Sequence, residues 1–176
     1  MVNLSIQKYF GRFSFYVLPL FRERTFAGTE GRLRSPLTVD EDDAEYDSGA
    51  EQWHTDLALR YSHYVGDWDF AASYFYGTGR EPTLRANQDA SELIPYYDII
   101  NQVGIDIQYT NEEWLWKFEG IVREGQGDTF AATVFGFEYT FFQFLNTNAD
   151  FGVLIEHLYD DRDEVNAPVT AFENDL

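Results

Sequence analysis

The sequence contains no cysteine, which excludes a disulfide framework and every metal site built on thiolates. Basic residues are scarce: 12 Lys and Arg stand against 31 Asp and Glu, giving a net charge of −19. Because phosphate binding needs clustered positive charge, nucleic acid is excluded as a partner. The chain also lacks any run of about 18 apolar residues, so no transmembrane helix is predicted.

Aromatic residues, in contrast, are abundant. They make up 18% of the 176 residues, with 16 Phe, 12 Tyr and 4 Trp against a single Met. The apolar fraction of 44% is ordinary for a folded protein, and the length suits one domain with a sizeable core. We therefore treat residues 1–176 as a single domain.

Apolar and polar residues alternate along most of the chain. In one segment Val103, Ile105, Ile107 and Tyr109 alternate with polar residues or glycine. Such a period of two predicts a strand with one apolar face. Eight segments follow the pattern, most of them longer than a typical soluble strand: 3–10, 13–22, 53–64, 68–78, 102–110, 114–123, 129–141 and 149–159.

The connections between these segments alternate in length. Two-residue turns are predicted at Gly11-Arg12, Gly66-Asp67 and Asn111-Glu112, since Gly and Asn tolerate the positive φ that such turns demand. Long polar connections are predicted over 23–52, over 79–98 and from residue 160 onward. The turns also predict a register, in which these pairs face each other across neighbouring strands: Phe10 with Phe13, Val65 with Trp68, Tyr109 with Trp114, and Asp106 with Lys117.

Aromatic side chains gather near the predicted strand ends. One group flanks the short turns: Phe10, Phe13, Tyr64, Trp68, Tyr109, Trp114, Phe141 and Phe142. A second group flanks the long connections: Phe21, Trp53, Tyr76, Tyr96, Tyr97 and Tyr159. Two aromatic belts, strands of about 9–11 residues and turns that are short on one side are typical of transmembrane β-barrels. A soluble β-sandwich or lipocalin-like barrel is the alternative fold.

With these features the chain resembles the porin-like β-barrel proteins of the Gram-negative outer membrane. The resemblance covers the whole chain as a pattern, and residues 1–26, with the segment Phe21-Arg22-Glu23-Arg24-Thr25-Phe26, look like an internal segment of poorly characterised members. It implies export by a cleaved signal peptide, insertion by the barrel-assembly machinery, and contact with outer-membrane lipid and lipopolysaccharide. It carries no catalytic signature, so we do not expect an enzyme, and no cofactor is expected.

The expected fold is all-β: an antiparallel up-and-down meander of about eight transmembrane strands, as a partial (open) or small barrel. The first predicted strand starts on the long-connection side, whereas both ends of such barrels normally lie on the short-turn side. We therefore expect a fragment of a longer barrel, with Met1 an internal methionine and a further strand starting near residues 173–176. Segments 3–10 and 149–159 should then not pair with each other.

The candidate functional residues are the charged side chains assigned to the non-lipid face. They would line a polar channel or fill a narrow interior with cross-strand ion pairs: His54, Asp56, Arg60, Asp69, Asp106, Lys117, Glu119, Arg123, Glu138 and Glu156. His54 and Asp56 lie two apart on one face, which could place two ligands on a metal, although solvated polarity is the simpler interpretation. No nucleophile and base are suitably placed for hydrolysis.

An acidic stretch follows the second segment. Asp40, Glu41, Asp42 and Asp43 supply the hard oxygen ligands that Ca²⁺ prefers, but their spacing is not that of an EF-hand, and a solvated surface loop is the simpler interpretation.

Three functions remain open from the sequence. The first is a porin-like protein that passes small solutes through a water-filled barrel in the bacterial outer membrane. The second is a non-channel surface protein, structural or adhesive, whose acidic loops make the contacts. The third is a soluble β-domain that binds a small ligand.

Overall fold

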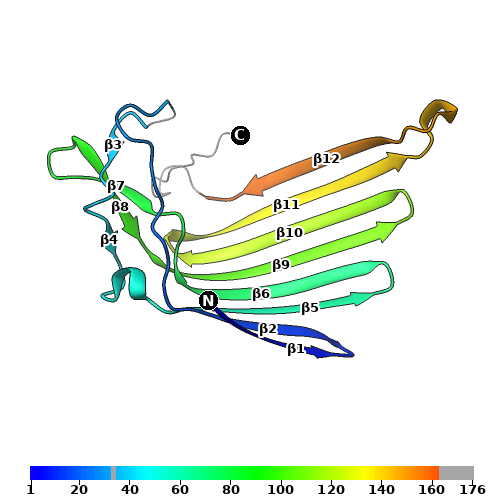
Figure 1. The fold of residues 1–176 in the computed structure, drawn as a ribbon, viewed down its shortest axis with the longest axis horizontal. Coiled ribbons are helices and arrows are strands. Elements are labelled where there is room, and N and C mark those ends of the chain that lie inside the picture. Colours follow the sequence, from blue (N-terminus) through cyan, green and yellow to red (C-terminus); the bar gives the residue numbers. More distant parts are fainter. Residues whose placement is uncertain (33–34, 163–176) are drawn as a thin grey trace.

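A single curved antiparallel sheet dominates the molecule (Figure 1). The computed structural model describes residues 1–32 and 35–162. The sheet has eight strands in the order β1-β2-β5-β6-β9-β10-β11-β12. Their bounds are β1 Val2–Lys8, β2 Gly11–Leu18, β5 Asp56–Val65, β6 Trp68–Thr78, β9 Ile99–Asn111, β10 Trp114–Gly125, β11 Gly127–Phe141 and β12 Phe151–Asp160. The predicted meander, with each strand paired to the next long strand in the chain, is confirmed.

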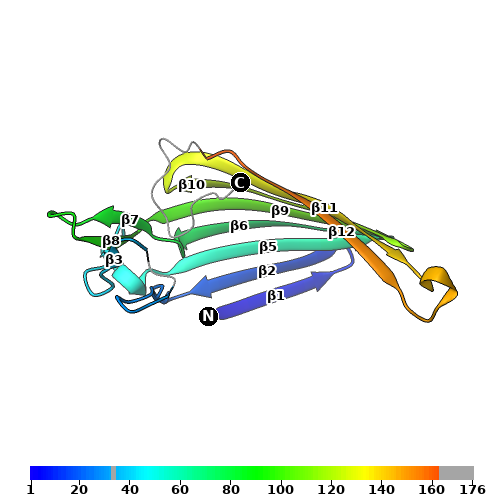
Figure 2. The same cartoon turned by 90° about the horizontal axis from the view of Figure 1, so that it is seen from above.

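The sheet does not close on itself. Strand β1 pairs only with β2 and strand β12 only with β11 within the described residues, so each forms an edge (Figure 2). The expectation that segments 3–10 and 149–159 would not pair is confirmed. The expected strand near residues 173–176 lies outside the described residues.

The hairpin registers agree with the prediction in one case of three. Val65 faces Trp68 as predicted. The second hairpin turns at Glu112-Glu113, so that Tyr109 faces Trp116 and Lys117 faces Gln108; the predicted register was wrong by two residues. A positive φ of 48° at Glu112 shows that a residue other than Gly or Asn occupies the left-handed position there.

The first hairpin also differs from the prediction. Its turn is Tyr9-Phe10, with Lys8 opposite Gly11, so that Phe10 does not face Phe13. Gly11 is needed for close packing instead of for the turn: a Cβ there would lie 2.5 Å from Tyr61 Cε2. Since its φ is 131°, a side chain at Gly11 would also strain the backbone.

Two faces of the sheet differ sharply in chemistry. We call the face that carries Phe13, Leu59, Tyr74, Ile105 and Phe135 the aromatic face; all five of these side chains are well exposed. The opposite face, which carries Arg60, Ser73, Asp106 and Glu119, is the polar face. Exposed apolar side chains that extend over several neighbouring strands are uncommon on soluble monomers.

The long connections contain a second, smaller sheet that the sequence did not predict. It comprises β3 Thr38–Val39, β4 Glu45–Tyr46, β7 Thr83–Ala86 and β8 Glu92–Tyr97, with β8 central. Short 3-10 helices follow at Glu51–Trp53 (η1) and, beyond β11, at Phe144–Asn146 (η2). No helix in the described part of the chain is long and apolar enough to span a lipid bilayer.

This small sheet has its own aromatic core. Phe21 and Tyr97 are only 2% and 1% exposed, with their ring centroids 5.0 Å apart, and Tyr46 stacks on Tyr97. The prediction that Phe21 and Tyr97 belong to an exposed aromatic belt was therefore wrong. Both rings instead pack the small sheet at the end of the large one, which we call the loop end; the opposite end, with the two-residue turns, is the turn end.

Candidate functional site

Nine of the ten candidate residues project from the polar face of the large sheet. The register places them in rows that run across neighbouring strands. One row runs Arg12, Ser62, Ala71, Asp106, Glu119, Val134. The next row toward the turn end runs Tyr64, Asp69, Gln108, Lys117, Gly136, Glu156. The tenth candidate, His54, precedes β5 and lies at the loop end.

An ion pair joins two of the candidates across strand β6. Arg60 Nη2 lies 2.6 Å from Asp106 Oδ1, and both side chains are about two-fifths exposed, at 43% and 38%. Arg60 of β5 and Asp106 of β9 can meet across β6 because the β6 residues between them, Ala71 and Ser73, have small side chains. A pair this exposed contributes little to stability, roughly 0–1 kcal/mol, so its main effect is on the local charge of the face.

A hollow of about 250 Å³ lies beside this pair. Its lining includes Gln7, Arg12, Arg60, Ser62, Asp69 and Asp106. Positively and negatively charged side chains therefore line the same open, solvent-exposed hollow. Its hydroxyl, amide, guanidinium and carboxylate groups can all hydrogen-bond a polar solute.

Among the charged side chains of the polar face from β9 to β12, acidic ones outnumber basic ones; Leu154 and Leu158 of β12 are exposed on the same face. Asp106 and Glu119 face each other directly, and like charges in this position are mutually destabilising. Arg60 offsets the charge of Asp106, whereas Glu119 is exposed. Lys117 and Glu156 are also exposed, and Glu138 is partly exposed between Leu115 and Leu154. The exposed charge on this side of the face is therefore mostly negative.

Arg123 has a different environment, near the loop end. Its Nε donates to Gln102 Oε1 at 2.9 Å, and its guanidinium carbon lies 5.5 Å from the Phe130 ring centroid. Gln126, which is 4% exposed, accepts from Arg123 and donates to the carbonyl of Glu81 at 2.7 Å. This network ties β10 to the connection that carries β7.

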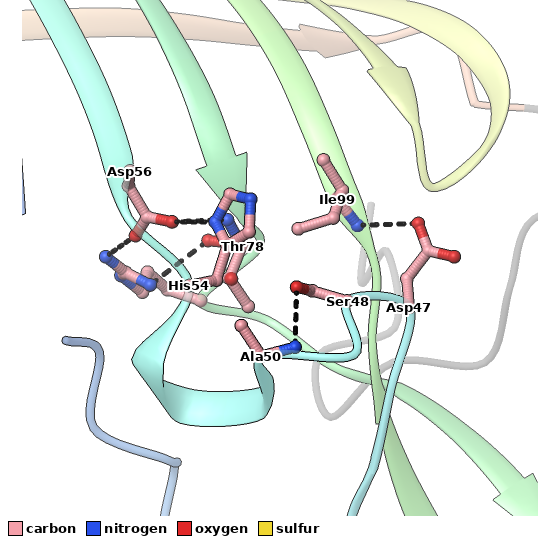
Figure 3. Close-up of polar contacts among 8 residues, drawn as sticks. Asp47, Ser48, Ala50, His54, Asp56, Thr78 and Ile99 are labelled. Carbon is pink, nitrogen blue, oxygen red and sulfur yellow. Dashed lines mark hydrogen bonds and ion pairs between the residues drawn. The ribbon is translucent and has the colours of Figure 1, made fainter. Parts of the chain in front are cut away.

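Asp56 does not line a wet surface, which corrects the sequence interpretation. Its side chain is fully buried at 0% exposure and accepts hydrogen bonds from three neighbours (Figure 3). Oδ1 accepts from the Thr78 backbone N–H at 2.9 Å and from His54 Nδ1 at 2.8 Å. Oδ2 accepts from Arg80 Nη2 at 2.5 Å. His54 is thus a hydrogen-bond donor to Asp56, because a carboxylate can only accept.

The residues around Asp56 were mostly missed from sequence. Gly77 permits the approach, since a Cβ there would lie 2.3 Å from Asp56 Oδ1. Arg80 extends the cluster, with its guanidinium carbon 5.1 Å from the Phe21 ring centroid. The hydroxyl of Thr78 is buried without a hydrogen-bond partner among the described residues. The sequence signal that could have indicated this cluster is the segment Gly77-Thr78-Gly79-Arg80, in which two glycines flank a threonine and an arginine follows.

The acidic stretch forms local loop contacts. Asp40 Oδ1 accepts from the Asp42 backbone N–H at 3.0 Å, and Glu41 Oε1 accepts from the Phe26 N–H at 2.5 Å. Asp42 and Asp43 are exposed. Across residues 1–32 and 35–162, no group of three or more His, Asp or Glu is placed to hold a metal ion.

Burial raises the pKa of several side chains in and beside the small sheet. It raises the pKa of Asp98, whose Oδ2 accepts from Thr83 Oγ1 at 2.7 Å. It also raises the pKa of Tyr97, and the pKa of Tyr46 is raised by burial and by a hydrogen bond to Glu23. These groups support the structure of the loop end and do not form a catalytic arrangement.

Comparison with known proteins identifies no relative: no family model, curated protein or solved structure matches the chain.

Proposed function

We propose that the eight-stranded sheet forms part of the wall of an outer-membrane β-barrel, and that its polar face lines a water-filled path for the passive passage of small solutes. The observation that carries the proposal is the contrast between the two faces: long antiparallel strands with exposed aromatic and aliphatic side chains on one side, and mixed charges on the other. Lipid would cover the aromatic face, because amphipathic and apolar side chains suit the hydrocarbon and interfacial zones of a bilayer.

The charges of the polar face support a preference for cations and neutral solutes. Asp69, Glu119 and Glu156 are exposed there, and rings or rows of carboxylates favour cations in channels. The hollow beside Arg60 and Asp106 offers hydrogen-bonding groups to a polar solute moving along this wall. Outer-membrane lipid, lipopolysaccharide and the barrel-assembly machinery are the partners that this proposal entails.

Conductance across planar bilayers or liposomes tests the proposal. The expected result is a stepwise, ohmic current with cations more permeant than anions. Membrane insertion without any current would instead support a structural or adhesive surface protein, and recovery of the protein only in the soluble fraction would support a soluble ligand-binding β-domain.

One observation favours the surface-protein alternative as a second candidate. The loop end carries an ordered sheet with a buried Phe21–Tyr97 core, and an ordered platform suits contact with another macromolecule. Deletion of residues 83–97 separates the two functions: a channel should keep its current, whereas a surface protein should lose its contacts.

A further inference from the structure

A second hollow interrupts the aromatic face near the turn end. Its volume is about 250 Å³, and carbon atoms form nearly all of its exposed surface. The residues that line it come from β6, β9, β10 and β11: Trp68, Ile107, Tyr109, Trp116, Lys117, Phe118 and Phe135. By register the side chain of Lys117 projects from the opposite, polar face.

The register explains why the hollow forms at this position. Trp68, Tyr109 and Trp116 lie in one row across three strands, and the Trp68 and Tyr109 ring centroids are 4.7 Å apart. In the next row Ile107 lies between Phe70 and Phe118. Because isoleucine is smaller than the rings around it, the surface is recessed at Ile107.

The shape and chemistry of the hollow restrict its occupant. It is smaller than typical small-molecule pockets of roughly 300–1,000 Å³, and its walls offer almost no hydrogen-bonding groups. A polar ligand would lose its hydration there without gaining hydrogen bonds in return. A segment of a flexible hydrocarbon chain loses nothing polar and gains contact with the rings.

The two turns at the end of the same strands carry only negative charge. They are Gly66-Asp67 and Glu112-Glu113. The Thr110 N–H donates to the Asp67 carbonyl at 2.9 Å, which holds the first turn against the end of β9, two residues before Glu112. Three carboxylates therefore lie at the membrane-boundary end of the strands that form the hollow. They repel a headgroup with net negative charge, and as acceptors they can take hydrogen bonds from a primary ammonium group, which a quaternary ammonium group cannot donate.

We propose that this hollow and the two acidic turns bind a phospholipid with a primary-amine headgroup, with one acyl chain in the hollow and the ammonium group at Asp67, Glu112 and Glu113. The proposal rests on the membrane placement of the aromatic face but not on solute passage. It assigns the lipid by two separate features: an apolar recess for the chain and a charge pattern for the headgroup.

Lipid retention by the full chain in detergent tests the proposal. Native mass spectrometry would compare phosphatidylethanolamine, phosphatidylcholine and phosphatidylglycerol with identical chains. We expect retention of the ethanolamine lipid over the other two, and loss of this preference in the double variant Glu112→Gln, Glu113→Gln. Filling the recess with Ile107→Phe should lower retention about fivefold, the effect of losing contact over about one methylene group.

Val103→Phe is the matched control, since Val103 lies on the same face of β9 and does not line the hollow. It should leave retention unchanged. Equal retention of the three lipids, or equal effects of Ile107→Phe and Val103→Phe, would overturn the site.

A measurement without variants separates this site from the membrane placement on which it rests. Lipids brominated on the acyl chain quench nearby tryptophans, and Trp68 and Trp116 border the hollow. Stronger quenching by the ethanolamine lipid than by the choline lipid supports the site. Equal quenching by both overturns the site alone, whereas no quenching by either overturns the placement of the aromatic face in lipid.

Discussion

The two ends of the large sheet carry charge in opposite ways. At the loop end Asp56 is fully buried and accepts three hydrogen bonds, and Arg123 is held by Gln102 and Gln126. Toward the turn end Asp69, Lys117 and Glu156 are exposed. Charged residues on the same face thus have different surroundings: the buried carboxylate is bound to the backbone and side chains around it, and the exposed groups set the electrostatic potential of the polar face.

The difference has a simple physical origin. A buried carboxylate is tolerated only where donors replace the water it has lost. At the loop end these donors come from His54 before β5, from the Thr78 N–H of β6 and from Arg80 in the following connection. Near the turn end the hairpins are tight, and within residues 1–32 and 35–162 Asp69, Lys117 and Glu156 stay exposed. Stability should therefore depend on charge at one end and solute selectivity on charge at the other.

The largest expected effect is the loss of Asp56. Asp56→Ala leaves the Thr78 N–H, His54 and Arg80 without their acceptor, and should lower the free energy of unfolding by about 3 kcal/mol. Urea unfolding in detergent, followed by tryptophan fluorescence, measures the loss. Asp106→Ala is the matched control and should cost less than about 1 kcal/mol, because its ion pair with Arg60 is well exposed. Equal losses would break the comparison between the two ends.

Gly77→Ala should have the next largest effect. Its Cβ would displace the Asp56 carboxylate, and overpacking of this kind costs roughly 1–3 kcal/mol. Gly152→Ala in β12 is the control, since nothing lies within 4 Å of a Cβ there. The same unfolding measurement should show the control within about 0.5 kcal/mol of the unaltered chain. A harmless Gly77→Ala would show that Asp56 can move without cost.

Charge reversal on the exposed wall should change selectivity and hardly affect stability. Arg60→Glu removes the cation beside Asp106 and adds a carboxylate, so the ratio of cation to anion permeability should rise severalfold. Reversal potentials in a salt gradient measure this ratio. The shift should shrink in about 1 M salt, where charges are screened within roughly 3 Å. An unchanged ratio at low salt would exclude this face from the solute path.

The smallest expected effect is a change in pH dependence at the small sheet. Burial raises the pKa of folded Asp98, so the folded state holds this proton more tightly than the unfolded state. Its contribution is most favourable below the ordinary carboxyl pKa and is lost as pH rises through the raised value. Asp98→Asn should remove this decline. Unfolding measured between acidic and neutral pH checks the slope, and a slope that persists in Asp98→Asn would assign it to another group.

Sequence periodicity predicted the large sheet well because alternation is a property of each strand alone. Strand identity, order and the two faces follow from side-chain parity, as with Val103, Ile105 and Ile107. Register was harder, because a shift of two residues preserves the parity: the turn at Glu112-Glu113 keeps Tyr109 and Trp116 on the aromatic face while changing their partners. The turn at Gly11-Arg12 was predicted wrongly because Gly11 was taken as a turn residue, whereas it is required by close packing against Tyr61.

The small sheet at the loop end could not be predicted from the sequence, for a different reason. Its small sheet brings together strands of two to six residues from distant parts of the chain, such as Thr38 with Glu92, and such short strands show no periodicity. Asp56 was placed on the correct face, but its burial depends on Arg80 and Gly77, which reach it through tertiary packing. A residue's face can be predicted from parity, whereas its exposure depends on what folds over it.

The direction of the two edge strands limits how this sheet can take part in a closed wall. Strand β1 runs from the loop end to the turn end, and β12 runs the opposite way. The two edges could therefore meet directly as antiparallel neighbours, and any strands between them would have to alternate in direction. Only an even number, zero included, keeps every pairing antiparallel. A fully antiparallel barrel built on this sheet has an even total of strands, which is the parity found in single-chain bacterial outer-membrane barrels.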